Sequence, residues 1–197
     1  YIKSGIYKNA LVIGSETLSK VLDWNDRRTC VLFGDGAGAV VVKEDVTGID
    51  DMLMGSDGSK GDVLTCDYKS NKHPFIEESR YSDVIDMNGQ EVFKFAVKKV
   101  PETIESLLSK TGTDINSIKY FVLHQANSRI IQSVAKRLKV SEERFPMNLS
   151  HCGNTSAASI PILLDEIHKK RMLDKDDKIV LSGFGGGLTW SAVQITW

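Results

Sequence analysis

The hydrophobic and polar positions along the chain predict strands that alternate with helices. Continuous apolar runs at residues 8–14, 120–123 and 177–182 indicate buried strands, the first of them buried on both faces, and residues 188–197 indicate a closing strand. Apolar residues at helical spacing predict helices that begin near Asn88, after Asn127 and after Asn154. Gly112 is expected to end the first helix, and Pro101 to kink it or to start a second segment.

The stretch at residues 120–138 places a histidine at a strand end. The apolar run ends in His124, and the chain turns at once into a helix with core positions at Ile130, Ile131, Val134, Ala135 and Leu138. A side chain at the carboxyl end of a strand in an open α/β sheet lies where ligands normally bind. His124 is therefore a candidate for chemistry, although a single histidine in such a place is more often structural.

Other segments predict turns and loops. The glycine cluster at residues 34–38 opens a strand rather than a helix, which favours a tight bend with close backbone packing over a phosphate-binding loop. Residues 46–86 are rich in Gly, Asp, Ser and Lys with little periodicity, so we expect a linker and loop region there. Residues 55–58 and the pair His73 and Pro74 are typical of turns.

Composition narrows the class of protein. A chain of 197 residues with 41% hydrophobic and 26% charged residues is an ordinary globular sequence, and its net charge of -1 gives no global attraction to nucleic acid or membranes. No signal peptide or apolar run of membrane-spanning length is visible. Cys30, Cys66 and Cys152 have no paired spacing, which argues against a disulfide framework and against a zinc site, so a reducing cytoplasm is expected.

The two ends of the chain repeat one order of elements. A helix tail, an apolar strand and a glycine-bounded second strand at residues 1–42 are loosely matched by residues 168–193. Residues 1–5 look like the tail of a helix closed by Gly5. We therefore expect two copies of one unit, the first incomplete, and a chain that is a fragment.

Four motifs occur in a fixed order: residues 33–39 (FGDGAGA), 124–127 (HQAN), 153–159 (GNTSAAS) and 183–190 (GFGGGLTW). As a set they closely resemble the C-terminal part of the β-ketoacyl-acyl-carrier-protein synthase III family, condensing enzymes of the thiolase superfamily. The resemblance implies a thiolase-like five-layered α/β/α/β/α fold whose first half is truncated here. Residues 1–45 would be the tail end of the N-terminal half, 46–86 the linker and loop region, and 87–197 the C-terminal half.

The resemblance also implies a reaction. An acyl primer, expected to be acetyl, passes from coenzyme A to a cysteine, and malonyl-acyl carrier protein is then decarboxylated and condensed with it to begin fatty-acid synthesis. Of the Cys-His-Asn triad, His124 and Asn154 match, whereas the nucleophilic cysteine is expected upstream of Tyr1, so that the chain alone is expected to be inactive. The backbone N–H of Gly186 is assigned to a second oxyanion site. The alternative for Asn154 is a plain helix cap, and Cys152 is considered and disfavoured as a substitute nucleophile.

Binding residues are carried over in the same way. Trp24 and Arg27 are expected beside the adenine and phosphates of coenzyme A, and Gln90 and Asn127 along the pantetheine tunnel. A local basic patch would dock the acidic carrier protein, although most such charges are only a solvated face; its residues are Lys94, Arg129, Lys136 and Arg137. No metal and no permanently bound cofactor are expected.

The partners and the rival interpretations complete the hypothesis. Expected partners are acyl carrier protein, acyl-coenzyme A, a second subunit in a homodimer, and the missing N-terminal half in the same or a second chain; nucleic acid and membranes are not expected. One alternative is a condensing enzyme of secondary metabolism with another acyl donor. The other is a half that no longer catalyses and serves binding or assembly.

Overall fold

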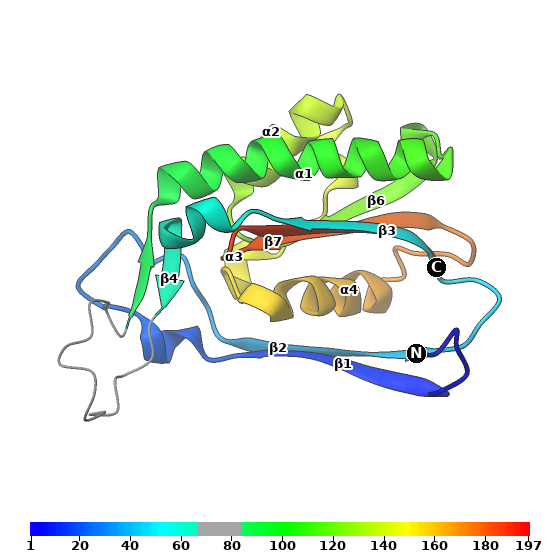
Figure 1. Ribbon diagram of the computed structural model, residues 1–197, viewed down its shortest axis with the longest axis horizontal. Coiled ribbons are helices and arrows are strands. Elements are labelled where there is room, and N and C mark those ends of the chain that lie inside the picture. The colour runs from blue at the N-terminus through cyan, green and yellow to red at the C-terminus, as the bar shows by residue number, and fades with distance from the viewer. Residues whose placement is uncertain (67–83) are drawn as a thin grey trace.

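The structure is a computed structural model that describes residues 1–66 and 84–197, so the turn expected at His73 and Pro74 lies outside the described residues. Four layers are stacked (Figure 1): helices α1 (Gly89–Thr111) and α2 (Ser128–Leu138), a four-stranded sheet, helix α4 (Ser159–Lys169), and the strand pair β1 (Asn9–Glu16) and β2 (Gly36–Lys43). This order corresponds to four of the five layers of the expected α/β/α/β/α fold.

The four-stranded sheet has the order β3-β8-β7-β6. Its strands are β3 (Ile49–Ser56), β6 (Ile118–Leu123), β7 (Lys178–Gly185) and β8 (Thr189–Thr196). Strands β6 and β7 are parallel, and β8 is antiparallel to both β7 and β3. The carboxyl ends of β6 and β7 therefore lie at one edge of the sheet, beside the first turns of α2 and α4.

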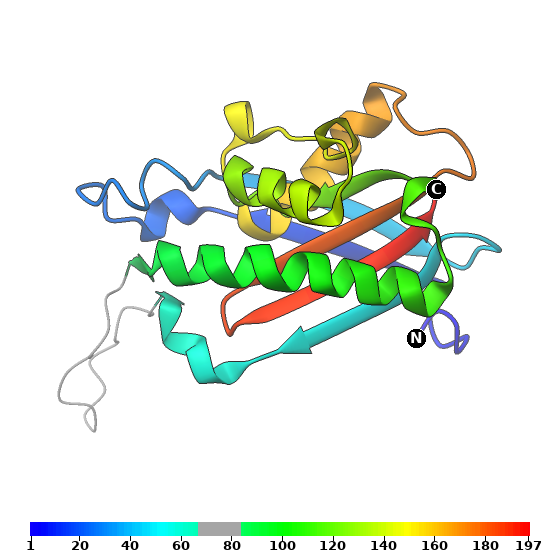
Figure 2. The ribbon, with the colours of Figure 1, turned by 90° about the horizontal axis from the view of Figure 1, so that it is seen from above.

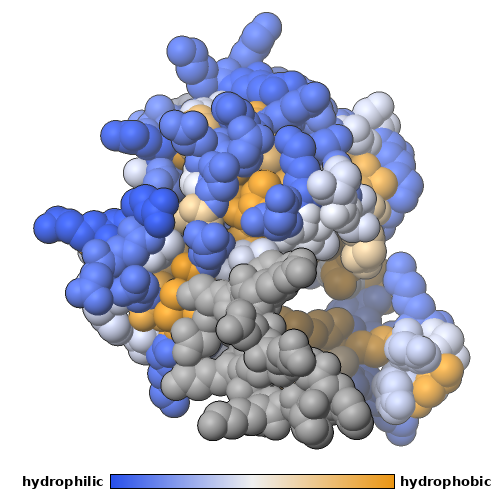
Figure 3. All heavy atoms as spheres, turned by 60° about the vertical axis from the view of Figure 1, so that its left-hand side comes forward, coloured by the Kyte–Doolittle hydropathy of each residue, from blue (hydrophilic) through white to orange (hydrophobic). Residues whose placement is uncertain are grey.

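Helices α1 and α2 cover one face of this sheet side by side (Figure 2). The five core positions expected on α2 are all buried, and α1 buries Val92, Ala96, Val100, Ile104 and Leu107 along one stripe. Their outer face is mostly hydrophilic in the space-filling view, with hydrophobic side chains below it (Figure 3). The main core thus lies between α1, α2 and the sheet.

Short elements connect these layers. The strands β4 (Leu64–Cys66) and β5 (Ile85–Met87) pair with each other, and the four-residue helix α3 (Leu149–Cys152) precedes α4. In the described part of the chain, five 3-10 helices make turns: η1 (Leu18–Val21), η2 (Gly58–Val63), η3 (Ile115–Ser117), η4 (Glu142–Arg144) and η5 (Ser156–Ala158).

Pro101 neither ends α1 nor starts a second segment, because the helix runs unbroken from Gly89 to Thr111. Proline has no N–H, so it leaves the carbonyl oxygen of Val97, four residues earlier, without its usual helical partner. Arg137 of α2 lies 3.4 Å from that oxygen through Nη1 and 3.3 Å from a Glu102 oxygen through Nη2. The contact with Arg137 therefore compensates for the helical hydrogen bond that Pro101 cannot donate.

The loop expected at residues 46–86 is wrong for Ile49–Ser56, which forms β3 and pairs along its length with β8. The aspartates at 50 and 51 hide this strand from a pattern analysis. In the structure Asp50 accepts hydrogen bonds from Gln194 and Thr196 of β8, and Asp51 forms an ion pair with Lys110 at 2.8 Å. The proposed division into two halves stays a prediction.

Strand β1 forms where it is expected but is not buried on both faces. Leu11 and Ile13 are each 61% exposed, because β1 and β2 form a two-stranded sheet with only one face against α4 and η5. Val12, on the opposite face of β1 from these two residues, is also 54% exposed. Among the helices that the structure describes, none is long and apolar enough to span a membrane.

Candidate active site

The candidate site lies at the carboxyl edge of the parallel strands. His124 directly follows β6, and its backbone N–H donates to the Ser182 carbonyl of β7 at 2.8 Å. Helix α2 begins four residues later, with the Asn127 side chain accepting from the Arg129 N–H at 2.8 Å as its N-cap. The sequence prediction of a histidine between a buried strand and a helix is confirmed.

The His124 ring is held by two residues from other elements. Its Nδ1 lies 2.7 Å from the Ser159 hydroxyl at the start of α4, and the Phe184 ring packs edge-on at a centroid distance of 5.4 Å. Burial lowers the pKa of His124 to about 4, so the ring is neutral at pH 7. The Ser159 oxygen also accepts a hydrogen bond from the Gln125 N–H at 3.3 Å. Where the Ser159 hydroxyl donates to Nδ1, the neutral ring carries its own proton on Nε2.

Asn154 is fixed by its backbone on both sides. Its N–H donates to the Leu32 carbonyl and its carbonyl accepts from the Gly34 N–H, each at 2.9 Å. Its side-chain oxygen accepts from the Ser156 N–H at 3.0 Å, so Asn154 closes a local turn and does not cap α4, which begins at Ser159. The Nδ2 group has no acceptor among the described residues and remains available as a donor.

The glycine-rich segment at residues 34–38 is a close-packing device, as the sequence favours. A Cβ on Gly34 would lie 2.3 Å from the Cys152 carbonyl oxygen, and one on Gly38 would lie 2.9 Å from the Pro161 side chain. Gly34 and Gly38 thus let the segment approach α3 and α4. This contact holds the backbone of Asn154 in place.

Two hollows meet at His124. An open groove of about 700 Å³ lies between β3, β7, β8 and the start of α4, and a smaller cavity of about 220 Å³ lies between the start of α1, α2 and the Asn154 turn. Four residues line both: His124, Ser156, Phe184 and Gly185. Asn154, Gly186 and Asn127 line the smaller cavity, so these three expected site residues lie around one space with His124.

The other expected binding residues do not line either hollow. Gln90 is exposed on the first turn of α1, although its neighbour Gly89 does line the smaller cavity. Trp24 is 66% exposed and Arg27 is also exposed, both on the loop that leads to the cavity residues Leu32 and Phe33. Their roles with coenzyme A stay predictions.

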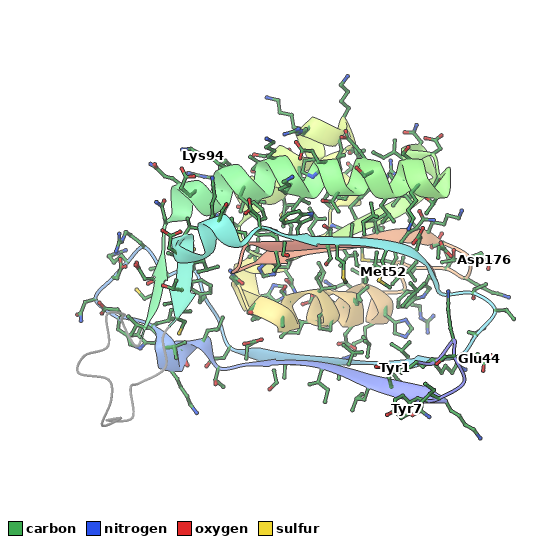
Figure 4. All side chains as sticks on the ribbon, viewed as in Figure 1. Tyr1, Tyr7, Glu44, Met52, Lys94 and Asp176 are labelled. Atoms are coloured by element: carbon green, nitrogen blue, oxygen red, sulfur yellow. The ribbon has the colours of Figure 1, made fainter. Side chains whose placement is uncertain are left out.

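The four basic residues of the expected docking patch differ in their surroundings. Lys94, labelled on α1 in Figure 4, forms an ion pair with Glu91 at 2.8 Å, and Arg137 is bound to α1 as described above. Arg129 and Lys136 are exposed on α2, and neither has a carboxylate within ion-pair distance in the described part of the chain. Of these four residues, the two without an ion pair both lie on α2.

Cys152 does not resemble an activated nucleophile. Burial and the nearby Glu166 carboxylate raise the pKa of its thiol, which keeps the thiol protonated at neutral pH. It is also absent from the lining of both hollows around His124.

Sequence reasoning missed Ser159 and Phe184 as partners of His124. Both lie within quoted motifs, but each meets the histidine only through the tertiary fold, 35 and 60 residues along the chain. The sequence signal that pointed to Ser159 was its position at the start of the helix that follows Asn154, because that end of the helix was expected to face the site.

Two models of one family match the chain. The 3-oxoacyl-[acyl-carrier-protein] synthase III model matches residues 1–58, and the C-terminal model of the same family matches residues 108–197. Among curated proteins, the β-ketoacyl-[acyl-carrier-protein] synthases III of Clostridium novyi and Clostridium acetobutylicum are 51% and 50% identical over the whole chain. The chain spans 61% of the length of each of these relatives.

Solved structures give the same result. The synthase III of Aquifex aeolicus is 43% identical with a TM-score of 0.89, and that of Thermus thermophilus 39% with a TM-score of 0.91. Both cover the whole chain, which spans 60% and 61% of theirs. The priming β-ketosynthase of the R1128 polyketide pathway is 32% identical over 99% of the chain, with a TM-score of 0.88; the chain spans 59% of it. The thiolase-like fold is thus confirmed, and the chain belongs to the β-ketoacyl-[acyl-carrier-protein] synthase III family.

Proposed function

We propose that this chain supplies the decarboxylation and condensation part of a β-ketoacyl-acyl-carrier-protein synthase III, an acyltransferase that begins fatty-acid synthesis. One observation carries the proposal: the two candidate side chains each have one polar end occupied and a donor left over. Ser159 lies at Nδ1 of His124, and with the serine hydroxyl as donor the ring proton is on Nε2; the Ser156 N–H occupies Oδ1 of Asn154 and leaves Nδ2–H. Both residues line the same cavity of about 220 Å³.

Two donors at one cavity suit the decarboxylation of a malonyl thioester. When the bond to the carboxylate carbon breaks, carbon dioxide leaves and the electron pair moves into the thioester, so that negative charge develops on its oxygen. Donors from His124 and Asn154 that wait at that oxygen stabilise the charge, and one such donor is typically worth about 3 to 4 kcal/mol of barrier. A neutral histidine with its proton on Nε2 is the form this step needs.

The condensation step uses the backbone. The carbanion formed by decarboxylation attacks the carbonyl carbon of an acyl-cysteine, the carbonyl oxygen takes up the charge, and the thiolate then leaves as the 3-oxoacyl product forms. Gly186 lines the cavity and would offer its N–H to that oxygen. We place the nucleophilic cysteine in sequence upstream of Tyr1, which is supported by the share of the relatives' length that the chain spans and by the raised thiol pKa of Cys152.

The substrates and partners follow from this reaction. We infer an acyl-coenzyme A primer, with acetyl-coenzyme A first among candidates, and malonyl-acyl carrier protein, whose acidic surface would meet Arg129 and Lys136 on α2. We assign Trp24 and Arg27 to the adenine and phosphates of coenzyme A, and Gln90 and Asn127 to the pantetheine tunnel. A homodimer without a resident cofactor, acting in the cytoplasm, completes the proposal.

The test separates the two half-reactions in the protein expressed from its complete gene. Intact mass after exposure to acetyl-coenzyme A measures acyl loading, and carbon dioxide release from malonyl-acyl carrier protein measures decarboxylation. His124→Ala and Asn154→Ala are expected to lower decarboxylation at least 100-fold, from the loss of one oxyanion donor each, and to leave acyl loading measurable. Equal loss of both steps contradicts the division of roles, and absence of any loading in the unaltered protein favours a non-catalytic assembly half.

A second candidate is a condensing enzyme of secondary metabolism that uses another acyl donor at the same site. The likeness to the R1128 priming ketosynthase supports it. Competition among acetyl-, branched and longer acyl-coenzyme A donors in the same mass experiment distinguishes the two, because a primary synthase is expected to load one short or branched primer in strong preference.

A further inference from the structure

A cluster of three metal-ligating side chains lies behind the Asn154 turn. His151 and Cys152 end α3, and Glu166 projects from the middle of α4. His151 Nε2 lies 3.0 Å from Glu166 Oε1, Cys152 Sγ lies 4.0 Å from the same oxygen, and the donor atoms of the three residues all lie within 4.8 Å of one another. None of the three lines the hollows around His124.

These separations are close to those around a tetrahedral metal ion. Metal bonds of about 2.3 Å to sulfur and about 2.0–2.2 Å to nitrogen or oxygen place neighbouring ligand atoms roughly 3.3 to 3.7 Å apart. The distances of 3.0 and 4.0 Å to Glu166 lie on either side of that range, and all three ligand atoms lie within 4.8 Å of one another, so the side chains would have to rotate to close around an ion. An ion there would replace the proton shared between His151 and Glu166.

Neighbouring groups orient the ligands. The Asn148 side chain is buried and donates from Nδ2 to Glu166 Oε1 at 2.8 Å, and its backbone N–H donates to the Gln125 side chain at 3.2 Å. On the other side, the Ser150 hydroxyl lies 3.4 Å from Nδ1 of His151, where it can accept that N–H while Nε2 binds a metal. Hydrogen-bonded carboxylates and histidines of this kind are the usual supports of metal ligands.

The donor set selects the class of ion. A thiolate, an imidazole and one carboxylate suit zinc and similar borderline cations, whereas magnesium and calcium prefer oxygen ligands alone. The His151 side chain is 57% exposed, so an ion can reach the site from solvent. Three protein ligands leave a fourth position for water. The Lys170 ammonium group lies 3.4 Å from Glu166 Oε2, and its side chain would have to move away because it would repel a bound cation.

We propose that His151, Cys152 and Glu166 bind a zinc-class divalent cation that links α3 to α4 immediately before Asn154. The cysteine spacing argued against a zinc site. That spacing cannot reveal this one, since Glu166 comes from a different helix. The link would restrain the segment from Asn148 to Gly153 and raise the stability of the protein while the ion is bound.

Cobalt(II) provides the test because thiolate coordination gives it a near-ultraviolet charge-transfer band. The protein expressed from its complete gene is titrated with cobalt and then with competing zinc, and its melting temperature is followed alongside. The band is expected in the unaltered protein and in the matched controls Cys30→Ala and Cys66→Ala, and zinc is expected to abolish it and raise the melting temperature. Cys152→Ala is expected to lack the band.

His151→Ala tests the site without disturbing a packed residue, since this side chain is exposed. We expect it and Glu166→Gln to weaken cobalt binding by about tenfold or more. No band in the unaltered protein, a band that persists in Cys152→Ala, or unchanged affinity in His151→Ala would overturn the proposal. The readout does not depend on condensation activity, so it stands or fails separately from the proposed function.

Discussion

Ser159 is the residue through which α4 sets the proton on His124. Its hydroxyl is 2.7 Å from Nδ1 and only 2% of the residue is exposed, so no water can readily take its place. Ser159→Ala is expected to lower decarboxylation by at least about tenfold, because the ring loses the partner that favours the Nε2–H tautomer. Imidazole ¹⁵N chemical shifts of His124 should move toward a mixture of tautomers in the same variant.

Thr155 offers a matched control in the same motif. Its hydroxyl is buried and has no hydrogen-bond partner among residues 1–66 and 84–197, and the residue lines neither hollow. Thr155→Val keeps the shape, so we expect unchanged or slightly higher stability and an unchanged His124 spectrum. Identical spectra for Ser159→Ala and the unaltered protein would remove the positioning role.

The lowered pKa of His124 predicts a pH-dependent stability. The ring titrates near pH 4 in the folded state and near 6.5 in the unfolded state, so the unfolded state binds the proton first as the pH falls. Above pH 6.5 the ring is neutral in both states and does not change the free energy of unfolding. Between pH 6.5 and pH 4, proton binding to the unfolded state lowers the free energy of unfolding by about 3 kcal/mol. Urea titrations at pH 7, 5.5 and 4 should therefore show a shallower decline for His124→Gln than for the unaltered protein; parallel declines would contradict the assignment.

For single residues, the sequence predicts where a side chain lies along strands and helices better than it predicts which other residues that side chain contacts. His124 and Asn127 could be placed because a strand end and a helix start are local features. The contacts with Ser159 and Phe184, and the cluster of Cys152 with Glu166, arise from segments that only the fold brings together. For Gln90 the family resemblance suggested a place along the pantetheine tunnel; its neighbour Gly89 lines the cavity, and the role of Gln90 stays a prediction.

Among the elements, the turn from residue 32 to residue 34 decides where Asn154 lies. The Gly34 N–H donates to the Asn154 carbonyl oxygen at 2.9 Å, and a Cβ on Gly34 would lie 2.3 Å from the Cys152 carbonyl oxygen. Gly34→Ala is expected to push the two segments apart, to lower the free energy of unfolding by about 1–3 kcal/mol and to lower decarboxylation with it.

Gly58→Ala is the comparison for that variant, since its Cβ would meet nothing within 4 Å. Thermal unfolding and carbon dioxide release measure both variants in parallel. Equal behaviour of the two alanine variants would mean that the close approach at Gly34 does not hold the Asn154 turn.

Two elements show why local patterns fail. Strand β3 carries two aspartates that the sheet accepts because β8 and α1 supply their partners, and α1 keeps its course through Pro101 because Arg137 reaches the freed carbonyl. Both compensations cross between elements, so no window along the chain contains them. By contrast, the prediction of α2 is confirmed from its cap to its core positions, because every residue that indicates this helix lies within it or directly before it.

Across the whole molecule, α4 lies between two related strand pairs. Strands β1 and β2 are antiparallel, as are β7 and β8, and the two pairs lie on opposite sides of α4 (Figure 1). The loose repeat noticed in the sequence thus has a structural counterpart. The pairs differ in their surroundings: β7 and β8 are flanked by β6 and β3, whereas within the described residues β1 and β2 pair only with each other.

That difference leaves an apolar face on the outer side of β1 and β2. The register places Leu11 opposite Val41 and Ile13 opposite Ala39, and Gly36 and Gly38 on the alternate positions face α4. Leu11, Ile13 and Val41 are 61%, 61% and 72% exposed. Contiguous apolar surface with unpaired strand edges is a template for association.

A polypeptide limited to residues 1–197 is therefore expected to self-associate or to require a partner that covers this face. Size-exclusion chromatography with light scattering measures it, and dye binding to exposed apolar surface should be strong. Replacing Leu11 and Val41 with lysine is expected to reduce association while circular dichroism stays unchanged, because both side chains point away from α4. A compact monomer with little dye binding before any substitution would show instead that the four layers are self-sufficient, and the expectation that a partner must cover this face would then have to be given up.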